Sequence, residues 1–219
     1  MPIRHRRLML VTLALALLGY WSPWLTHPAA SLRLNGYELS EWVTFLPGVH
    51  NGSLALSRLS FLVPLACLSL ILSITASLTA SPRPRPASLF WPRWPSALLG
   101  WILLFLALLC SAALFPAYPY ILTAYKDPEF QFQFFIACAI PFGILLTFYL
   151  PTELKDLLQI PLALLGGAYG LWSLLAVRPA ATELLDAPWA VGLGWVAMLA
   201  GFAGLIIASL ARTFGPRGA

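Results

Sequence analysis

No charged residue lies inside the long apolar stretches of this chain, although it has 13 Lys and Arg and 8 Asp and Glu residues. Proton-coupled pumps and transporters commonly place ionisable side chains within the bilayer, because moving a charge requires a group that carries or balances it. Enzymes that act at membrane depth likewise need paired carboxylates, a metal, or a nucleophile with a nearby base. The sequence contains no such set. We therefore expect no catalytic residues and no enzyme.

Cysteine and histidine are also scarce, with three of each. The cysteines are Cys67, Cys110 and Cys138, which belong to different apolar stretches and form no C-x-x-C pair. This spacing suggests neither a redox site nor a metal cluster. The histidines are His5, His27 and His50, and none lies in the middle of an apolar stretch, which argues against axial haem ligands. We expect no metal and no cofactor, and we leave any cofactor-binding residues unassigned.

Apolar residues are abundant: 60% of the chain is hydrophobic and only 10% is charged, which is typical of a protein surrounded by lipid. A helix needs roughly 20 apolar residues to cross the hydrocarbon core. Six segments qualify, at residues 8–24, 59–80, 95–115, 131–150, 157–177 and 190–211. The runs are apolar on every face, which favours helices over the alternating strands of a β-barrel. The predicted fold is an all-α bundle of about six transmembrane helices, forming a single polytopic membrane domain over residues 1–219.

The distribution of positive charge predicts the orientation, because Lys and Arg near the ends of spans stay preferentially on the cytoplasmic side. With six passes, one side would hold nine of the cationic residues and only two of the acidic ones. That side contains both termini. We therefore expect the N- and C-termini to be cytoplasmic, and the basic balance to reflect topology instead of a nucleic-acid site.

The first segment has a second interpretation. The arginines at positions 4, 6 and 7, followed by an apolar run, also resemble a secretory signal peptide. Cleavage would leave five passes. Pro28 interrupts the candidate cleavage stretch at residues 27–30, which favours a retained first helix.

Small residues recur at helix-packing spacing in the last two segments. In lipid, apolar helices associate through close backbone approach, for which small residues are needed. The last segment carries a small-residue stripe, and the fifth carries a glycine group that offers a groove. The stripe comprises Gly194, Ala197, Gly201, Gly204 and Ala208, and the group comprises Gly166, Gly167 and Gly170. We expect these two helices to form a tight pair.

The second segment has hydroxyl residues at every fourth position, Ser69, Ser73 and Ser77. Each hydroxyl can bond to backbone carbonyls or to a neighbouring helix, so packing is the favoured interpretation. The alternative is a polar path for a solute. That alternative requires a cavity lined by convergent groups such as Ser69, Ser73, Thr147 and Gln159.

The external loop at residues 25–58 has a helical pattern of its own. Asn35 and Glu38 fit an N-cap with its reciprocal partner, and Pro47-Gly48 predicts an end. Between them, Leu39, Trp42, Val43 and Leu46 share one face. We expect an amphipathic interfacial helix whose apolar face lies on the outer leaflet, covers the bundle or docks a partner.

These observations favour a non-catalytic multi-pass protein that serves as an accessory or structural subunit of a larger membrane complex. The alternative is a component that binds or transports a small solute or lipid, such as the integral substrate-binding subunit of an importer. The expected partners are membrane lipids and other membrane-protein subunits, without nucleic acid. The expected location is the cytoplasmic membrane of a bacterium.

Overall fold

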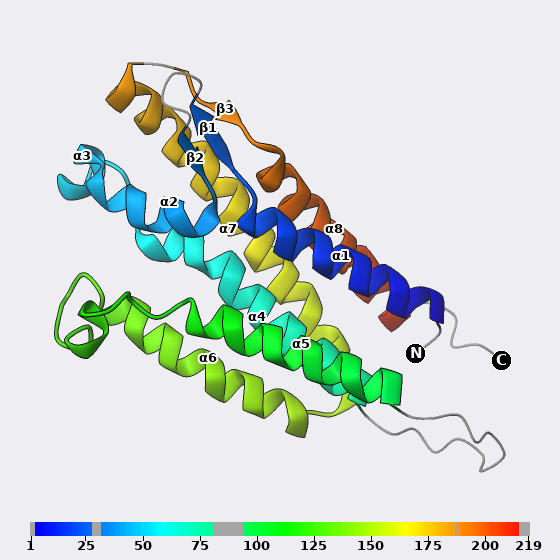
Figure 1. Cartoon of the computed structure of the whole chain (residues 1–219). Coiled ribbons are helices and arrows are strands. Elements are labelled where there is room, and N and C mark those ends of the chain that lie inside the picture. Colours follow the sequence, from blue (N-terminus) through cyan, green and yellow to red (C-terminus); the bar gives the residue numbers. More distant parts are fainter. Residues whose placement is uncertain (1–2, 28–31, 81–93, 187, 215–219) are drawn as a thin grey trace, which may run out of the picture. The chain divides into compact units, whose positions relative to one another are not determined.

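The computed structural model describes residues 3–27, 32–80, 94–186 and 188–214, and it is mostly helical (Figure 1). Helices account for 78% of the structure. Four of the described helices are long and apolar enough to cross a membrane. They are α4 (Arg58–Ala80), α6 (Gln131–Tyr149), α7 (Thr152–Leu185) and α8 (Leu193–Phe214). The chain is therefore a helical protein suited to a membrane.

The other two predicted segments are also helical but do not meet the same criteria. α1 (Ile3–Trp21) has 19 residues and begins with a cluster of arginines, and α5 (Trp94–Ala112) contains a shorter apolar helix, Ala97–Ala112, among the described residues. The candidate signal-peptide cleavage stretch lies largely outside the described residues. Six helices thus match the six segments in position, and four of them qualify as spans by length and composition.

α7 is longer than the sequence pattern predicts. It begins at Thr152, five residues before the expected start, and continues for 34 residues. At 1.5 Å per residue its length is about 51 Å, well beyond a hydrocarbon core of about 30 Å. Its charged residues lie near its two ends, with Glu153, Lys155 and Asp156 at the start and Arg178 and Glu183 toward the end. The helix can therefore cross the apolar layer with its charges outside it.

The chain divides into two compact units. The first contains residues Met1–Leu68 and Asp156–Ala219, and the second contains Ser69–Lys155. In the first unit α1 and α8 lie side by side along their lengths (Figure 1). The second unit consists of the second half of α4, α5, a short 3₁₀ helix at Tyr120–Leu122, and α6.

The first unit also contains a small sheet that the sequence analysis did not predict. Its strands are β1 (Leu25–His27), β2 (Leu32–Leu34) and β3 (Ala190–Val191), in the order β2-β1-β3. Both pairings are antiparallel, with Leu25 opposite Leu34 on one side and Val191 on the other. The sheet joins the segment that follows α1 to the segment that precedes α8.

The helix predicted in the loop at residues 25–58 is present as α2 (Gly36–Trp42). The Asn35 side chain accepts a hydrogen bond from the Glu38 N–H at 2.9 Å, and the Glu38 carboxylate accepts one from the Asn35 N–H at 2.8 Å. This is the predicted capping box. A 3₁₀ turn at Val43–Phe45 follows α2, and Pro47 then begins the short helix α3 (Pro47–His50). Proline is well suited to this first helical position because it lacks an N–H.

Candidate functional site

The small-residue stripe of α8 packs against α1. A methyl group added to Gly201 would overlap the backbone of Ala16, and one added to Gly204 would overlap the Thr12 side chain. Nearer the start of α8, a methyl group on Gly19 of α1 would lie 2.7 Å from the Gly194 carbonyl oxygen. These contacts run in opposite directions along the two helices. α1 and α8 are therefore an antiparallel pair in backbone contact.

This arrangement differs from the expected pairing of the stripe with the glycines of the fifth segment. Those glycines accept large side chains of α8 instead. A methyl group on Gly166 would lie 2.5 Å from Cζ of Phe202, and one on Gly167 would lie 3.4 Å from its Cβ. Gly170 faces the end of the Met198 side chain. α8 therefore contacts α1 through its small residues and contacts α7 through its large side chains.

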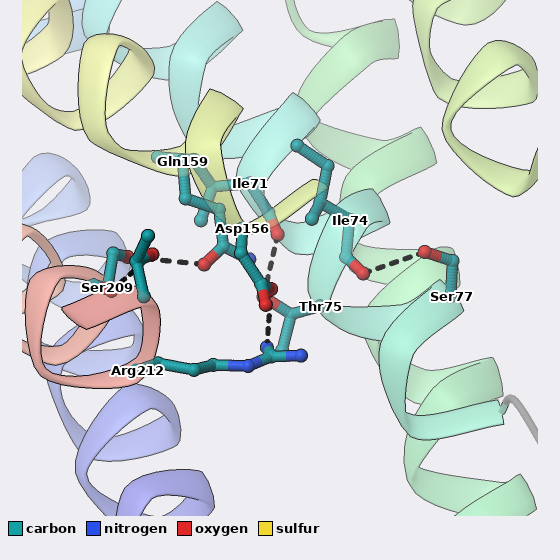
Figure 2. A network of polar contacts seen from close by, with 9 residues as sticks. Ile71, Ile74, Thr75, Ser77, Asp156, Gln159, Ser209 and Arg212 are labelled. Atoms are coloured by element: carbon teal, nitrogen blue, oxygen red, sulfur yellow. Dashed lines mark hydrogen bonds and ion pairs between the residues drawn. The ribbon is translucent and has the colours of Figure 1, made fainter. Parts of the chain in front are cut away.

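Polar side chains also join α7 to α8 (Figure 2). The Arg212 guanidinium forms an ion pair with the Asp156 carboxylate at 2.9 Å, and the Ser209 hydroxyl donates to Gln159 Oε1 at 3.2 Å. On each helix the two residues are three positions apart, so they share one face. Further along, Trp195 Nε1 donates to the Gly170 carbonyl at 2.8 Å. These polar groups join α7 to α8. They include Gln159, which was a candidate for lining a polar path.

Hydroxyl groups in the second unit bond to the helices around them. Ser69 donates to the Ala107 carbonyl at 2.8 Å, and Ser73 donates to the Ile144 carbonyl at 3.2 Å. Ser73 also lies 2.6 Å from the Thr147 hydroxyl. Thr75 and Ser77, drawn in Figure 2, donate to the carbonyls of Ile71 and Ile74 within their own helix. The candidate groups for a polar path thus bond to backbone carbonyls or to each other.

The apolar face of α2 lies inside the first unit. Leu39 and Val43 are 0% exposed and Leu46 is 1% exposed, so these side chains are not available to a partner protein. Trp42 is half-buried and packs against Trp189, with ring centroids 5.8 Å apart. The apolar face of α2 therefore packs on the interior of this chain, which is one of the three roles considered for it. Periodicity predicts an apolar face but cannot say what covers it.

A pocket of about 730 Å³ lies in the first unit where α1 ends and α8 begins. Its wall combines the end of α1, the three strands and the first turns of α8. The lining residues are Leu18, Gly19, Ser22, Pro23, Thr26, His27, Leu32, Arg33, Pro188, Ala190, Gly192, Leu193, Gly194 and Ala197. Most of them are apolar, and the volume is within the range of small-molecule sites. The pocket is the candidate functional site.

Backbone hydrogen bonds fix the wall of this pocket. The Gly192 N–H donates to the Trp24 carbonyl at 2.7 Å, and the Gly194 N–H donates to the Pro23 carbonyl at 3.1 Å. A methyl group on Gly194 would lie 2.5 Å from the Ser22 carbonyl carbon, so the start of α8 meets the chain after α1 at backbone distance. The absence of a side chain at Gly192 and Gly194 permits this approach. The pocket is therefore part of a hydrogen-bonded framework.

The ionisable side chains in the lining are those of His27 and Arg33. His27 is 6% exposed, and its ring lies 5.1 Å from the ring of Trp189. Trp189 is in turn held by a bond from its Nε1 to the Ala181 carbonyl at 3.1 Å. Arg33 is exposed, and none of the ion pairs found among the described residues involves it. No Asp or Glu is among the lining residues. The ionisable groups of the pocket are thus basic.

Within the described residues, no group of three His, Cys, Asp or Glu side chains is placed to hold a metal ion. Cys67 and Cys110 are buried and Cys138 is half-buried, and all three are free thiols. Comparisons with protein-family models, with curated protein sequences and with solved structures found no match.

Proposed function

We propose that this chain is a non-catalytic multi-pass membrane protein that acts as an accessory or structural subunit of a larger membrane complex. The observation that supports this most directly is the use of the polar groups within its helices. Ser69, Ser73, Thr147 and Gln159 bond to carbonyls or to other side chains, and none of them lines the pocket. Groups used in this way hold helices together, which is the task of a scaffold.

The proposal includes six spans with both ends in the cytoplasm. The antiparallel contact of α1 and α8 supports it, because the arginine-rich start of α1 and Arg212 near the end of α8 lie at the same end of the pair. Positive residues at one end of adjacent helices are typical of the cytoplasmic side. α2 lies near the other end of α1, since Gly36 faces Tyr20 and Trp24. This position suits a helix at the outer membrane interface.

The broad apolar surface of α6 provides a place for other subunits or lipid. Only 22% of its most apolar stretch is buried inside the chain. Phe132 and Phe142 are each 73% exposed, and Tyr149 is 84% exposed. An apolar surface of this extent requires lipid or a protein around it. The proposed partners are accordingly membrane lipids and other membrane-protein subunits, in a bacterial cytoplasmic membrane.

Purification from the native membrane tests the subunit role. The tagged full-length chain, produced at its natural level, is extracted in a mild non-ionic detergent, and its companions are quantified by mass spectrometry. We expect one or more membrane proteins in fixed stoichiometry, which an unrelated tagged multi-pass protein from the same membrane does not retain. Recovery of the chain alone, in two detergents of different head group, would contradict the proposal.

A second candidate function is the binding of a small solute or lipid, and the pocket between α1, the sheet and α8 favours it. Its volume of about 730 Å³, its apolar lining and its two basic side chains are the features of a ligand site. Mass spectrometry of small molecules released from the purified protein tests this role. A reproducible bound compound that is lost when the pocket is filled would support binding, and its retention in a filled pocket would contradict it.

A further inference from the structure

The electrostatic character of the pocket restricts its ligand. The two ionisable side chains in the lining are His27 and Arg33, and no carboxylate accompanies them. α8 begins at this pocket with Leu193 and Gly194, has 22 residues, and has no acidic residue in its first turn. A helix N-terminus carries a partial positive charge that favours anions. Both features favour an anionic group over a cation.

The C-terminal end of α1 also lines the pocket, and its carbonyls would favour a cation if they were free. Two of them are already bonded. The Leu18 carbonyl accepts from the Ser22 hydroxyl at 2.7 Å, and the Gly19 carbonyl accepts from Trp24 Nε1 at 3.1 Å. The negative end of α1 is therefore partly neutralised by local donors. The start of α8 is partly satisfied in the same way, because the Gly194 N–H donates to the Pro23 carbonyl at 3.1 Å. The Arg33 guanidinium, with no carboxylate in the lining, is then the main charge in the pocket.

The apolar part of the lining continues onto the surfaces of the two helices. Leu18 lines the pocket, and Leu15 and Val11 follow on the same side of α1 at intervals of three and four residues. Their side chains are exposed by 67%, 38% and 64%, respectively. On α8, the pocket residue Leu193 is 86% exposed and Val196 is 50% exposed. A ligand with a polar head in the pocket would find apolar surface for alkyl chains along both helices.

We propose that this pocket binds an anionic phospholipid, with the phosphate near Arg33 and the first turn of α8, and with the acyl chains along the exposed apolar sides of α1 and α8. This rests on the second candidate function. Arg33 supplies a charge-assisted contact to the phosphate, for which guanidinium geometry is well suited. The pocket lies where α1 ends and α8 begins, opposite the basic residues of the proposed cytoplasmic face. The lipid therefore belongs to the outer leaflet.

Native mass spectrometry of the intact protein tests the proposal. The protein in non-ionic detergent is mixed with equal amounts of phosphatidylglycerol and phosphatidylcholine of identical acyl chains. We expect the first bound lipid to be phosphatidylglycerol by roughly fivefold, the size of one charge-assisted contact at a partly exposed site. Arg33→Gln should remove this preference. The matched control Arg7→Gln, an exposed arginine at the other end of α1, should retain it.

Two variants that fill the pocket locate the binding. Ala197→Phe adds a large side chain on α8, and Ala190→Leu adds one on β3. If one variant fails to fold, the other still tests the proposal. Thermal unfolding identifies the folded variant. We expect loss of the first bound lipid of either head group. If lipid retention is unchanged in a folded filled variant, both the phospholipid proposal and the ligand-binding function are wrong.

Two other outcomes would contradict the anionic phospholipid but not the ligand-binding function. Equal retention of the two lipids by the unaltered protein, together with loss of both in the filled variants, would mean that the pocket binds lipid without selecting charge. Displacement of phosphatidylglycerol by inorganic phosphate alone would mean that the site takes a free anion. In either case the ligand-binding function would stand and the anionic phospholipid would be excluded.

Discussion

The α1–α8 pair of the first unit and the helices of the second unit are held together in different ways. In the first unit, α1 and α8 meet at glycine and alanine, so that a methyl group added at Gly201 would overlap the Ala16 backbone. In the second unit, side chains reach carbonyls of neighbouring helices. Ser69 bonds to Ala107 of α5, and Gln133 Nε2 of α6 donates to the carbonyl of Leu114, in the turn after α5, at 2.9 Å. The α1–α8 pair of the first unit depends on close backbone approach, whereas α4, α5 and α6 of the second unit are joined by side-chain hydrogen bonds.

The difference shows two responses to the same physical condition. Between helices in lipid there is little hydrophobic driving force, so association depends on van der Waals packing and on interhelical hydrogen bonds. Backbone contact tolerates no added volume, because the backbone cannot move aside as a side chain can. A single side-chain hydrogen bond contributes only about 1 kcal/mol and can be lost without a steric clash. The α1–α8 contact should therefore be the more sensitive to substitution.

The largest effect is expected for Gly201→Leu. The leucine side chain would have to displace the Ala16 backbone, and overpacking of this kind destabilises by about 3 kcal/mol or more. We expect loss of the folded α1–α8 pair, seen as a large fall in the midpoint of thermal unfolding in bicelles. The matched control is Ala203→Leu, two residues away at an exposed position of α8. Equal effects of the two substitutions would disprove the backbone contact.

An intermediate effect is expected for Ser73→Ala in the second unit. The change removes bonds to the Ile144 carbonyl and to the Thr147 hydroxyl without adding volume. We expect the free energy of unfolding to fall by about 1 kcal/mol. A double-mutant cycle with Thr147→Val should give a coupling energy of roughly half that value, because the two hydroxyls bond to each other. A loss as large as that of Gly201→Leu would contradict the proposed difference between the units.

The smallest effect is expected for Gly170→Ala. Its added methyl group meets the flexible end of Met198, which can turn aside, and alanine favours the helix by roughly 0.5–1 kcal/mol over glycine. The net change in the free energy of unfolding should be near zero. Gly166→Ala is the informative comparison, because its methyl group meets the Phe202 ring and lies 3.1 Å from Cys67 Cβ. Thermal unfolding of both variants should show Gly166→Ala as clearly the less stable.

Several local features could be predicted from the sequence because they depend on residues close together in the chain. The capping box of Asn35 and Glu38 requires only the four residues from 35 to 38, and the structure contains it. The helices at the apolar segments also follow from local periodicity and length. The presence of apolar helices suited to a membrane is likewise confirmed. Six spans and the cytoplasmic position of both ends stay predictions.

The pocket could not be predicted, because its wall joins segments far apart in the chain. β1 pairs with β3 across some 165 residues, and strands of two or three residues are too short to show alternation. Arg33 lies in the loop at residues 25–58, and nothing near it in the chain indicates a pocket. Trp189 packs against His27 and Trp42, but from the sequence a single aromatic residue near a span indicates only a place at the membrane interface.

Composition and local pattern alone were enough to establish an apolar helical protein, the places where its helices lie and the small-residue face of α8. Which helix that face meets was decided by the tertiary structure. In lipid every apolar helix offers a similar surface, so the partner is chosen by the fit of shapes, and α1 fits the glycines of α8 while α7 accepts Phe202. The same holds for the face of α2, which is buried because the fold covers it, and for Arg33, which faces a pocket only when distant strands pair.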